Sequence, residues 1–440
     1  MDCIKVGMVS LGCSKNQVDA ELLMGRMAQA GMEITTDLSQ CQAVIINTCG
    51  FIEAAKAESI ETILEFCQMK EQGGIRCVVV TGCLAERYRD QLAQEIPEVD
   101  VVLGIGKNAD IVSAIQTALG GSHVTEFGEK TDLSLEGKRI LANAPYFAYL
   151  KVAEGCDNRC SYCAIPLIRG GFRSRPMENI VEEAKALAKS GVKEINLVAQ
   201  DTSRYGQDIY GSYKLAELID KVCEIPQVEW VRILYCYPDH VTDELIETMA
   251  RQPKVVKYID IPIQHASGRV LKEMNRRGDY NSLMELMQRF RQRIPGVVLR
   301  TTLIAGFPGE TEEDFEELCR FVEEARFERL GCFAYSQEED TPAGEREDQL
   351  EQEVRQRRAD LIMERQMEIA FDFAKSCVGR QLTVLVEGKK GKNYVGRSYM
   401  DAPDIDTKVT FASTKKHAPG DMVCVIIEQS DQYDLVGREL

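Results

Sequence analysis

The sequence contains no uninterrupted apolar stretch long enough to cross a lipid bilayer. Its first residues, Met1–Gly7, have the pattern of a strand and lack the basic and apolar regions of a secretion signal. We therefore expect a cytoplasmic protein with no membrane partner. The chain has 440 residues, 44% of them hydrophobic, which is enough for about two to four globular domains.

Basic residues are in deficit, with 53 Lys and Arg against 70 Asp and Glu and a formal net charge of −17. A strongly negative protein is poorly suited to broad contact with nucleic-acid phosphates, so nucleic acid is not expected to be the primary partner. The charge is compatible with a basic partner such as a ribosomal protein. It is equally compatible with a protein that is merely soluble, and net charge alone does not separate these interpretations.

Potential metal ligands are unevenly supplied, because the chain has 4 histidines but 16 cysteines. The cytosol keeps thiols reduced, so these cysteines are not expected to form disulfides. Cys156, Cys160 and Cys163 form a C-x3-C-x2-C run directly after an apolar, strand-like segment. Three thiolates on one loop suit a [4Fe–4S] cluster, which normally takes four cysteines. One iron is therefore predicted to stay open for a substrate or cofactor.

Two other kinds of site fit a cysteine-rich loop, namely a four-cysteine zinc site and an ordinary ferredoxin-type cluster. Zinc knots usually combine two C-x2-C pairs, and this chain has no second pair. The x3–x2 spacing, with Tyr162 before the last cysteine, instead resembles the signature of the radical S-adenosylmethionine (SAM) superfamily. In that superfamily the open iron binds the amino and carboxylate groups of SAM.

Residues 1–135 alternate between short apolar strands and helical patterns, as an N-terminal parallel α/β sheet domain does. The strands are predicted at Val6–Ser10, Ala43–Asn47 and Cys77–Thr81, and the helices at Gln17–Ala30, Glu53–Gln72 and Glu86–Glu95. Cys13, Cys49 and Cys83 each follow one of these strands, beside a glycine. Because the carboxyl ends of parallel strands meet at one edge, these cysteines are predicted to hold a second cluster with an open iron. The alternative is three buried structural cysteines.

Residues 146–375 repeat the alternation of strands and helices after a polar segment, 123–145, that is typical of a linker. Strands are predicted at Phe147–Ala153, Glu194–Ala199, Trp230–Tyr235, Tyr258–Ile263, Val298–Ile304 and Leu330–Tyr335. Helices are predicted at Met177–Ser190, Leu215–Cys223, Asp243–Arg251, Ser282–Ile294 and Glu312–Ala325, followed by a long amphipathic linker helix within 345–376. This pattern predicts a central partial (β/α)6 barrel, whose site lies at the carboxyl ends of its strands.

Several residues in the loops of this region are candidates for binding the cofactor: Tyr162, Gln200, Gly306 and Glu310. Gly306 and Gly309 would let the backbone approach the adenosyl group, and an ordinary Gly–Pro turn is the alternative. Gln200 is a candidate for contact with the cofactor or the substrate, and helix capping by Asp201 is the alternative. His265 is expected to be a packed, hydrogen-bonded residue rather than a metal ligand. The basic stretch Ile168–Arg175 fits either an acidic group of the substrate or of SAM, or a solvated loop.

Residues 378–440 change character and predict a small antiparallel β-barrel of the kind that often binds nucleic acid. Strands are predicted at Gln381–Glu387, Tyr394–Tyr399, Lys408–Ala412 and Met422–Gln429. Basic and acidic residues are balanced in this region, and its loop Asp401–Asp406 is acidic. Both features are unlike a typical RNA-binding barrel.

The order of these parts resembles the radical SAM methylthiotransferases, which join an N-terminal cluster domain, a radical SAM barrel and a C-terminal TRAM barrel. The stretches that carry the resemblance are Ser10–Asn16, Asn47–Ile52, Glu154–Pro166, Gln200–Gly206 and Asp401–Asp406. The resemblance covers essentially the whole chain. It implies two [4Fe–4S] clusters on the six cysteines described above, with SAM as the cofactor.

The resemblance also implies a reaction. A radical derived from SAM removes hydrogen from an unactivated carbon that no ordinary side-chain base can deprotonate, and the second cluster provides the methylated sulfur. One branch of the family modifies the β-carbon of an aspartate on the twelfth protein of the small ribosomal subunit, and a sister branch modifies an adenosine in transfer RNA. The acidic loop and the neutral third region favour the protein substrate. A reductant such as flavodoxin or ferredoxin is implied. Another sulfur-inserting radical enzyme and a non-catalytic iron–sulfur carrier remain alternatives.

Overall fold

The computed structural model describes residues 3–440, so the first two residues of the predicted Met1–Gly7 strand lie outside the described residues. The chain divides into two compact units. The first unit comprises the chain up to Ala142 together with Ala153–Arg175 and Ser336–Gly344. The second comprises Asn143–Val152, Pro176–Tyr335 and Glu345–Leu440. The loop of Cys156, Cys160 and Cys163 therefore belongs to the same unit as the N-terminal segment. The domain boundaries at 1–135, 146–375 and 378–440 stay predictions.

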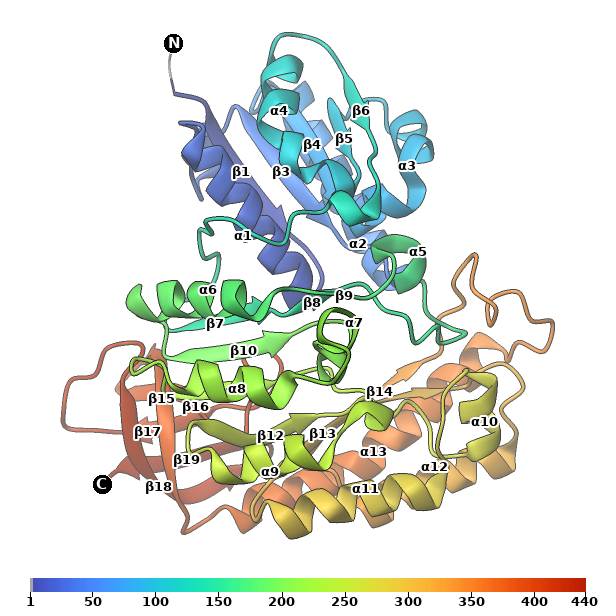
Figure 1. The fold of residues 1–440 in the computed structure, drawn as a ribbon, viewed down its shortest axis with the longest axis vertical. Coiled ribbons are helices and arrows are strands. Elements are labelled where there is room, and N and C mark those ends of the chain that lie inside the picture. The colour runs from blue at the N-terminus through green and yellow to red at the C-terminus, as the bar shows by residue number, and fades with distance from the viewer. Residues whose placement is uncertain (1–2) are drawn as a thin grey trace. The chain divides into compact units, whose positions relative to one another are not determined.

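The first unit is built on a six-stranded parallel sheet with the strand order β2-β1-β3-β4-β5-β6 (Figure 1). Its strands are β1 (Lys5–Ser10), β2 (Glu33–Ile34), β3 (Ala43–Thr48), β4 (Cys77–Gly82), β5 (Val101–Leu103) and β6 (Val124–Glu126). The predicted parallel α/β sheet is confirmed, and β1, β3 and β4 match the three predicted strands. The other three were not predicted, because two or three residues are too few to show a period. One of them, β6, lies inside the segment interpreted as a linker.

Helices cover both faces of this sheet. They are α1 (Ser14–Gln29), α2 (Glu53–Glu71), α3 (Cys83–Glu95) and α4 (Ile111–Leu119), with 3-10 turns at η1 (Leu38–Gln40), η2 (Ile105–Asp110) and η3 (Lys130–Asp132). Ile45 packs on one face with Leu23 of α1, whereas its neighbour Ile46 packs on the other face with Phe66 of α2. Successive strand side chains point to opposite faces, and both faces are buried. This explains why the strands are almost continuously apolar in sequence.

The second unit contains another six-stranded parallel sheet, with the order β14-β13-β12-β11-β10-β7. Its strands are β7 (Phe147–Lys151), β10 (Glu194–Val198), β11 (Trp230–Ile233), β12 (Val255–Asp260), β13 (Val298–Ala305) and β14 (Arg329–Ala334). The two edge strands do not pair, so the sheet is the open, partial barrel that the sequence predicted.

The helices of this unit follow the strands in alternation (Figure 1). They are α6 (Met177–Lys189), η4 (Thr202–Arg204), α7 (Gln207–Tyr210), α8 (Leu215–Cys223), η5 (Pro238–His240), α9 (Asp243–Arg251), α10 (Gly268–Glu273), α11 (Tyr280–Arg293), α12 (Glu312–Ala325) and α13 (Gln352–Ser376). The last of these is the long amphipathic helix expected within 345–376. Within residues 3–440, no helix combines the length and the apolar character needed to span a bilayer.

The C-terminal part of the second unit is a closed five-stranded barrel, with the order β15-β16-β17-β19-β18. Its strands are β15 (Gln381–Lys390), β16 (Asn393–Ser398), β17 (Val409–Ala412), β18 (Met422–Asp431) and β19 (Asp434–Glu439). All pairs are antiparallel except β17 with β19, which is parallel. The fifth strand, β19, was not predicted because its only large apolar residues are Leu435 and Val436.

Buried ion pairs join this barrel to the sheet of the same unit. Arg397 of β16 donates through Nη2 to Glu194 Oε2 at 2.7 Å, and Arg232 donates through Nε to Glu194 Oε1 at 2.8 Å. All three side chains are fully buried. Glu194 is the first residue of β10, so the barrel contacts the amino ends of the strands. The loops at the carboxyl ends, where barrel sites form, lie at the other edge.

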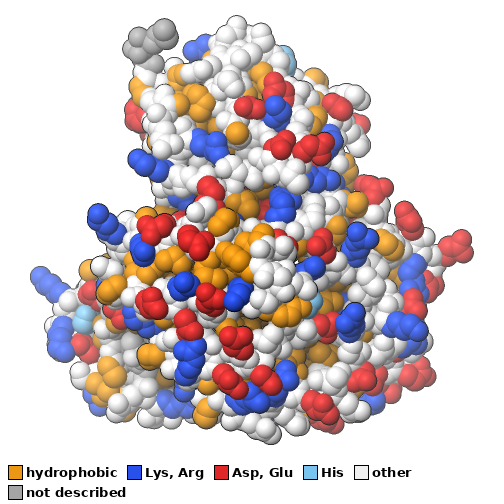
Figure 2. All heavy atoms as spheres, in the orientation of Figure 1, with side chains coloured by type: hydrophobic (Ala, Val, Ile, Leu, Met, Phe, Trp, Pro, Cys, Tyr) orange, Lys and Arg blue, Asp and Glu red, His pale blue; other side chains and the backbone are white. Residues whose placement is uncertain are grey.

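The acidic loop Asp401–Asp406 corrects one interpretation of the sequence. Asp401 Oδ1 accepts a hydrogen bond from Arg329 Nη2 at 2.7 Å, and Asp406 Oδ2 accepts one from Tyr258 Oη at 2.7 Å. These two carboxylates are bound inside the unit and are not offered to a partner. They therefore give no support to the choice between a protein and an RNA substrate. On the face drawn in Figure 2, acidic and basic side chains are interspersed rather than separated by sign.

We expect Arg397→Met to destabilise the second unit by about 3–5 kcal/mol, because it leaves the Glu194 carboxylate with an incomplete set of buried partners. Arg438→Met is the matched control, since Arg438 pairs with Glu428 at the surface, where both side chains are about half exposed. The control should change stability by about 0–1 kcal/mol. Trp230 is the only tryptophan and lies in β11, so its fluorescence during urea unfolding reports on this unit. Equal effects of the two variants would contradict the prediction.

Candidate active site

Three cysteines of the first unit follow neighbouring strands of its sheet. Cys13 follows β1 and precedes α1, Cys49 follows β3, and Cys83 is the first residue of α3 directly after β4. The structure therefore places all of them at the carboxyl edge of the sheet, as the sequence predicted from strand order. Their role as ligands of a cluster remains a prediction.

Asn16 connects the turns that carry these cysteines. Its Nδ2 group donates to Leu11 O at 2.7 Å, to Thr48 O at 3.1 Å and to Asn47 O at 3.2 Å. Asn47 returns a hydrogen bond from Nδ2 to Asn16 O at 2.7 Å. The hydroxyl of Thr48 donates to Thr81 O at 2.6 Å and so connects the next turn. Sequence reasoning did not single out this buried network, although Asn16 and Asn47 stand within three residues of a cysteine.

Glycines allow the same turns to approach each other. Gly12 has φ +88°, and a β-carbon on it would lie 2.8 Å from Cys49 Cβ and 2.9 Å from Cys49 Sγ. A β-carbon on Gly50 would lie 2.8 Å from Leu84 N and 3.0 Å from Cys83 C. Neither position has room for a side chain. The backbone of Gly12 therefore lies directly against the Cys49 side chain, and that of Gly50 lies against the backbone at the start of α3.

The thiols of these turns influence one another's ionisation. Burial, together with the neighbouring Cys83 and Cys13, raises the pKa of Cys49 to about 11. Burial also raises the pKa of Cys83, against the opposing charge of Arg169. Cys13 is exposed, and the charge of Lys15 together with backbone hydrogen bonds lowers its pKa. Thiolates bind metals, so a bound metal cluster would supply the positive charge that Cys49 and Cys83 need to ionise.

The second group of cysteines lies on a closed loop of the same unit. Two short strands, β8 (Ala153–Glu154) and β9 (Arg173–Ser174), pair at its base (Figure 1), and α5 (Ile165–Arg169) lies between them in the sequence. Cys156 N donates to Gly170 O at 3.1 Å, and Cys163 N donates to Cys160 O at 3.0 Å. Gly155 has φ +76° and abuts Gly171 O, which keeps the loop closed. Tyr162, a candidate for cofactor contact, is half-buried on this loop.

The basic stretch after these cysteines is not a solvated loop at its two ends. Arg169 is buried and donates through Nη1 to Asp19 Oδ2 at 2.5 Å. Arg175 is also buried and donates to both carboxylate oxygens of Glu136, at 2.9 and 2.7 Å. These arginines fix the loop to the N-terminal segment. The sequence showed that this stretch is rich in arginine. It could not show that Asp19 and Glu136 are the partners, because these residues lie far away in the chain.

The donor chemistry of these cysteines suits an iron–sulfur cluster. Among residues 3–440, no three or more His, Cys, Asp or Glu side chains surround one point closely enough to hold a single metal ion. A [4Fe–4S] cluster binds each cysteine through a different iron, so its thiols stand farther apart than the ligands of one ion. Three soft thiol donors on adjoining turns suit iron–sulfur chemistry.

The other candidate residues belong to the second unit. Gln200 follows β10, and the turn Gly306–Glu310 follows β13, so both lie at carboxyl ends of strands. Glu310 Oε2 accepts hydrogen bonds from Gly306 N at 2.8 Å and from Phe307 N at 3.1 Å, and Oε1 accepts one from Arg358 at 2.8 Å. Glu310 therefore shapes the turn itself. Contact of Gln200, Gly306 and Glu310 with a cofactor remains a prediction.

The two glycines of this turn have neighbours within the protein. Gly306 has φ +77°, and a β-carbon there would lie 2.5 Å from Arg355 Cγ; Gly309 has φ +73°, and a β-carbon there would lie 2.4 Å from Asp348 Oδ2. Close packing of the segment after β14 is thus sufficient reason for both glycines.

His265 is packed against this turn, as the sequence predicted. It is fully buried, and its Nδ1 accepts a hydrogen bond from Ser267 N at 3.0 Å. Its Nε2 lies 3.4 Å from Glu310 Oε2. Burial alone would raise the pKa of Glu310, but the contact with His265 and the charge of Arg358 lower it.

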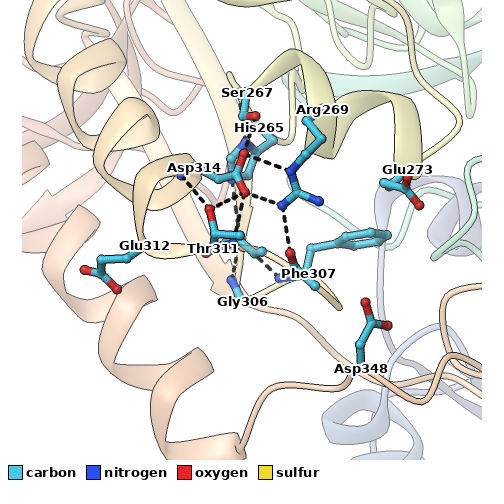
Figure 3. Close-up of polar contacts among 12 residues, drawn as sticks. His265, Ser267, Arg269, Glu273, Gly306, Phe307, Thr311, Glu312, Asp314 and Asp348 are labelled. Carbon is cyan, nitrogen blue, oxygen red and sulfur yellow. Dashed lines mark hydrogen bonds and ion pairs between the residues drawn. The ribbon is translucent and has the colours of Figure 1, made fainter.

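Asp314, at the start of α12, joins the same turn to the loop after β12 (Figure 3). It accepts hydrogen bonds from Ser267 Oγ at 2.6 Å and from Thr311 N at 2.9 Å, and it pairs with Arg269. Arg269 in turn donates to Gly309 O at 2.7 Å. Despite some burial, the hydrogen bonds from Arg269, Ser267 and Thr311 lower the pKa of Asp314. The turn is therefore held in one conformation from both sides.

Comparison with known proteins shows which protein families three segments of the chain match. The radical SAM superfamily model matches residues 150–322, the model of an uncharacterized protein family, UPF0004, matches residues 5–104, and a TRAM domain model matches residues 378–439. Ribosomal protein uS12 methylthiotransferase RimO of Lachnoclostridium phytofermentans is 47% identical over 99% of both chains. The protein of the same name from Pelotomaculum thermopropionicum is 49% identical, also over 99% of both chains.

The chain belongs to the RimO family of methylthiotransferases. It is therefore a radical SAM enzyme with an N-terminal UPF0004 segment and a C-terminal TRAM barrel. Among solved structures, the radical SAM methyltransferase TsrM from Kitasatospora setae matches with a TM-score of 0.57 and 13% identity, over 89% of this chain and 79% of that chain. The cobalamin-dependent radical enzyme OxsB matches with a TM-score of 0.52 and 14% identity, over 82% and 56%. At such low identity these two matches show a shared fold.

We expect Gly12→Ala to reduce the iron content of the reconstituted enzyme by about half, because the added methyl group forces the Cys13 and Cys49 turns apart and removes one of two clusters. Gly31→Ala is the matched control, since Gly31 has φ +84° but no atom within 4 Å of an added β-carbon. Gly31→Ala introduces a similar backbone strain but no steric clash with a neighbouring residue. Iron and sulfide analysis measures the outcome, and full iron content in Gly12→Ala would contradict the prediction.

A second prediction concerns Glu310. Its pKa is lowered in the folded chain, so the stability that its ionised form contributes is complete above about pH 5 and is lost as pH falls through about 4.3 toward the lowered pKa. The destabilisation caused by Glu310→Gln should therefore be largest at pH 7 and should shrink toward pH 4. Glu312→Gln, at an exposed partner of the same Arg358, should show little change across this range. Urea unfolding followed by Trp230 fluorescence measures both, and a pH-independent difference for Glu310→Gln would overturn the prediction.

Proposed function

We infer that this RimO-family chain adds a methylthio group to the β-carbon of an aspartate on ribosomal protein uS12. The observation that carries this conclusion is the match of nearly its whole length, at 47–49% identity, to proteins named uS12 methylthiotransferases. Transfer of a methylthio group to the adenosine of a transfer RNA uses the same chemistry and is the alternative that the experiment below must exclude.

The reaction uses SAM and two [4Fe–4S] clusters. When bound, these groups supply the one-electron chemistry and the methylthio group, neither of which amino-acid side chains provide. We propose that Cys156, Cys160 and Cys163 hold the cluster that binds SAM. The second cluster is assigned to the strand-end cysteines Cys13, Cys49 and Cys83.

The chain's own residues hold the two sets of thiols in fixed geometry. Asn16 connects the turns of the strand-end cysteines through three hydrogen bonds to backbone carbonyls. Arg169 connects the loop of the other cysteines to the helix that follows Cys13. Burial excludes water from Cys49 and Cys83, which protects reactive intermediates from side reactions. Three cysteines in each set would leave one iron of each bound cluster open, and these positions would serve SAM and the sulfur of the reaction.

We propose that the C-terminal barrel helps to bind uS12, either as the free protein or within the ribosome. Arg397 binds Glu194 and Asp401 binds Arg329, and these contacts with the sheet make the barrel a rigid part of the second unit. A reductant such as flavodoxin or ferredoxin is proposed to deliver electrons. We place the reaction in the cytoplasm, where ribosomes and reduced thiols occur together.

The test offers two substrates to the enzyme side by side. The anaerobically reconstituted protein is given SAM, a reductant, and either a uS12 peptide that contains the target aspartate or unmodified transfer RNA. Mass spectrometry reads both products. We expect the mass gain of a methylthio group on the peptide and none on the RNA.

Control variants separate chemistry from substrate choice. Cys156→Ala should abolish both SAM cleavage and product, whereas Cys83→Ala should abolish product while SAM cleavage persists, because the two cysteines are assigned to different clusters. A mass gain on the RNA alone would overturn the substrate assignment. SAM cleavage that survives Cys156→Ala at full rate would overturn the cluster assignment.

A further inference from the structure

Arg169 of α5 contacts a cysteine of the other cluster. Its Nη2 group lies 3.2 Å from Cys83 Sγ and donates to Asn16 Oδ1 at 3.0 Å. Its Nη1 group donates to Asp19 Oδ2 at 2.5 Å and lies 3.4 Å from Glu154 Oε2. One guanidinium thus touches residues from three separate stretches of the first unit.

The surroundings of Arg169 exclude water. Its side chain is 2% exposed, and those of Asp19 and Glu154 are 2% and 0% exposed. Beside it, Cys83 packs with Ala164 and Ile168 in a small apolar cluster that joins α3 to α5. A charge in such an environment acts strongly on its neighbours, because little solvent screens it. The guanidinium faces two carboxylates and one sulfur, so a thiolate at Cys83 completes a set of partners around it.

We propose that Arg169 is a positioning residue that sets the reduction potential of the cluster on Cys13, Cys49 and Cys83 through its N–H···S contact with Cys83. This inference rests on the proposed function, which assigns a cluster to those cysteines. Glu154 lies two residues before Cys156 and shares the same guanidinium. A residue on the SAM-cluster loop therefore tunes the other cluster.

The direction of the effect follows from electrostatics. Reduction adds negative charge to a cluster, and a cation or N–H donor at a ligand sulfur stabilises that charge, so it raises the reduction potential. Asp19 and Glu154 oppose this effect, because their negative charges partly cancel that of Arg169. Removal of the arginine should make the potential more negative, whereas neutralisation of Asp19 should make it more positive.

The experiment measures the midpoint potential of this cluster in the reconstituted holoenzyme by a redox titration followed by electron paramagnetic resonance. A variant with alanine at Cys156, Cys160 and Cys163 assigns the signal, since it keeps only the strand-end set of cysteines. Arg169→Met, Arg169→Lys and Asp19→Asn are compared with the parent. Arg173→Met is the matched control, because Arg173 lies on the same loop and bonds to backbone carbonyls such as Lys130 O and Gly171 O.

We expect Arg169→Met to shift the potential to more negative values, Arg169→Lys to shift it less, and Asp19→Asn to shift it to more positive values. Arg173→Met should shift it less than Arg169→Met does.

If Arg169 were only a structural link, its variants would lower iron content or stability while the remaining cluster kept the parent potential, and that result would overturn the inference. Shifts of the same sign in Arg169→Met and Asp19→Asn would also overturn it. Should Arg169→Met not fold, Asp19→Asn and Arg169→Lys decide the question. Absence of any cluster in the assignment variant would instead contradict the proposed function.

Discussion

The first unit depends on backbone contact between turns that carry thiols. Three parallel strands end side by side, and each is followed within three residues by a cysteine. Adjacent strands stand about 4.8 Å apart, so side chains on neighbouring turns would normally keep the backbones from closing further. Gly12 and Gly50 remove that obstacle, and Asn16 replaces the missing side-chain contacts with hydrogen bonds. The arrangement of the strand-end cysteines follows from this one constraint.

Much of the fold was predictable because its signals are local. Short, largely apolar segments marked β1, β3 and β4, and a cysteine soon after each of them was enough to predict a shared edge. The short strands β2, β5 and β6 were not predictable, because their pairing comes from neighbours in space. The same limit applies to Arg169, whose charge was visible in the sequence but whose partner Asp19 lies 150 residues away.

Long-range pairing also explains why one argument from the sequence about the substrate fails. In the sequence the acidic loop favours a protein substrate, yet Asp401 and Asp406 are bound to Arg329 and Tyr258. Charge composition says how many charges a segment has, and only the fold says which of them face solvent. The proposed substrate therefore rests on similarity to relatives along the whole chain, and the carboxylates of Asp401 and Asp406 add nothing to that proposal.

All six cysteines and Arg169 belong to one compact unit. Their mutual geometry is consequently fixed by contacts within that unit, whatever arrangement the second unit adopts. The C-terminal barrel, by contrast, is joined to the amino ends of the strands of the second unit through Arg397 and Glu194. Contacts that hold the thiols and contacts that hold the barrel are thus separate sets of residues. A change in one set should alter cluster chemistry without altering the barrel, and a change in the other should do the reverse, which makes the two roles experimentally separable.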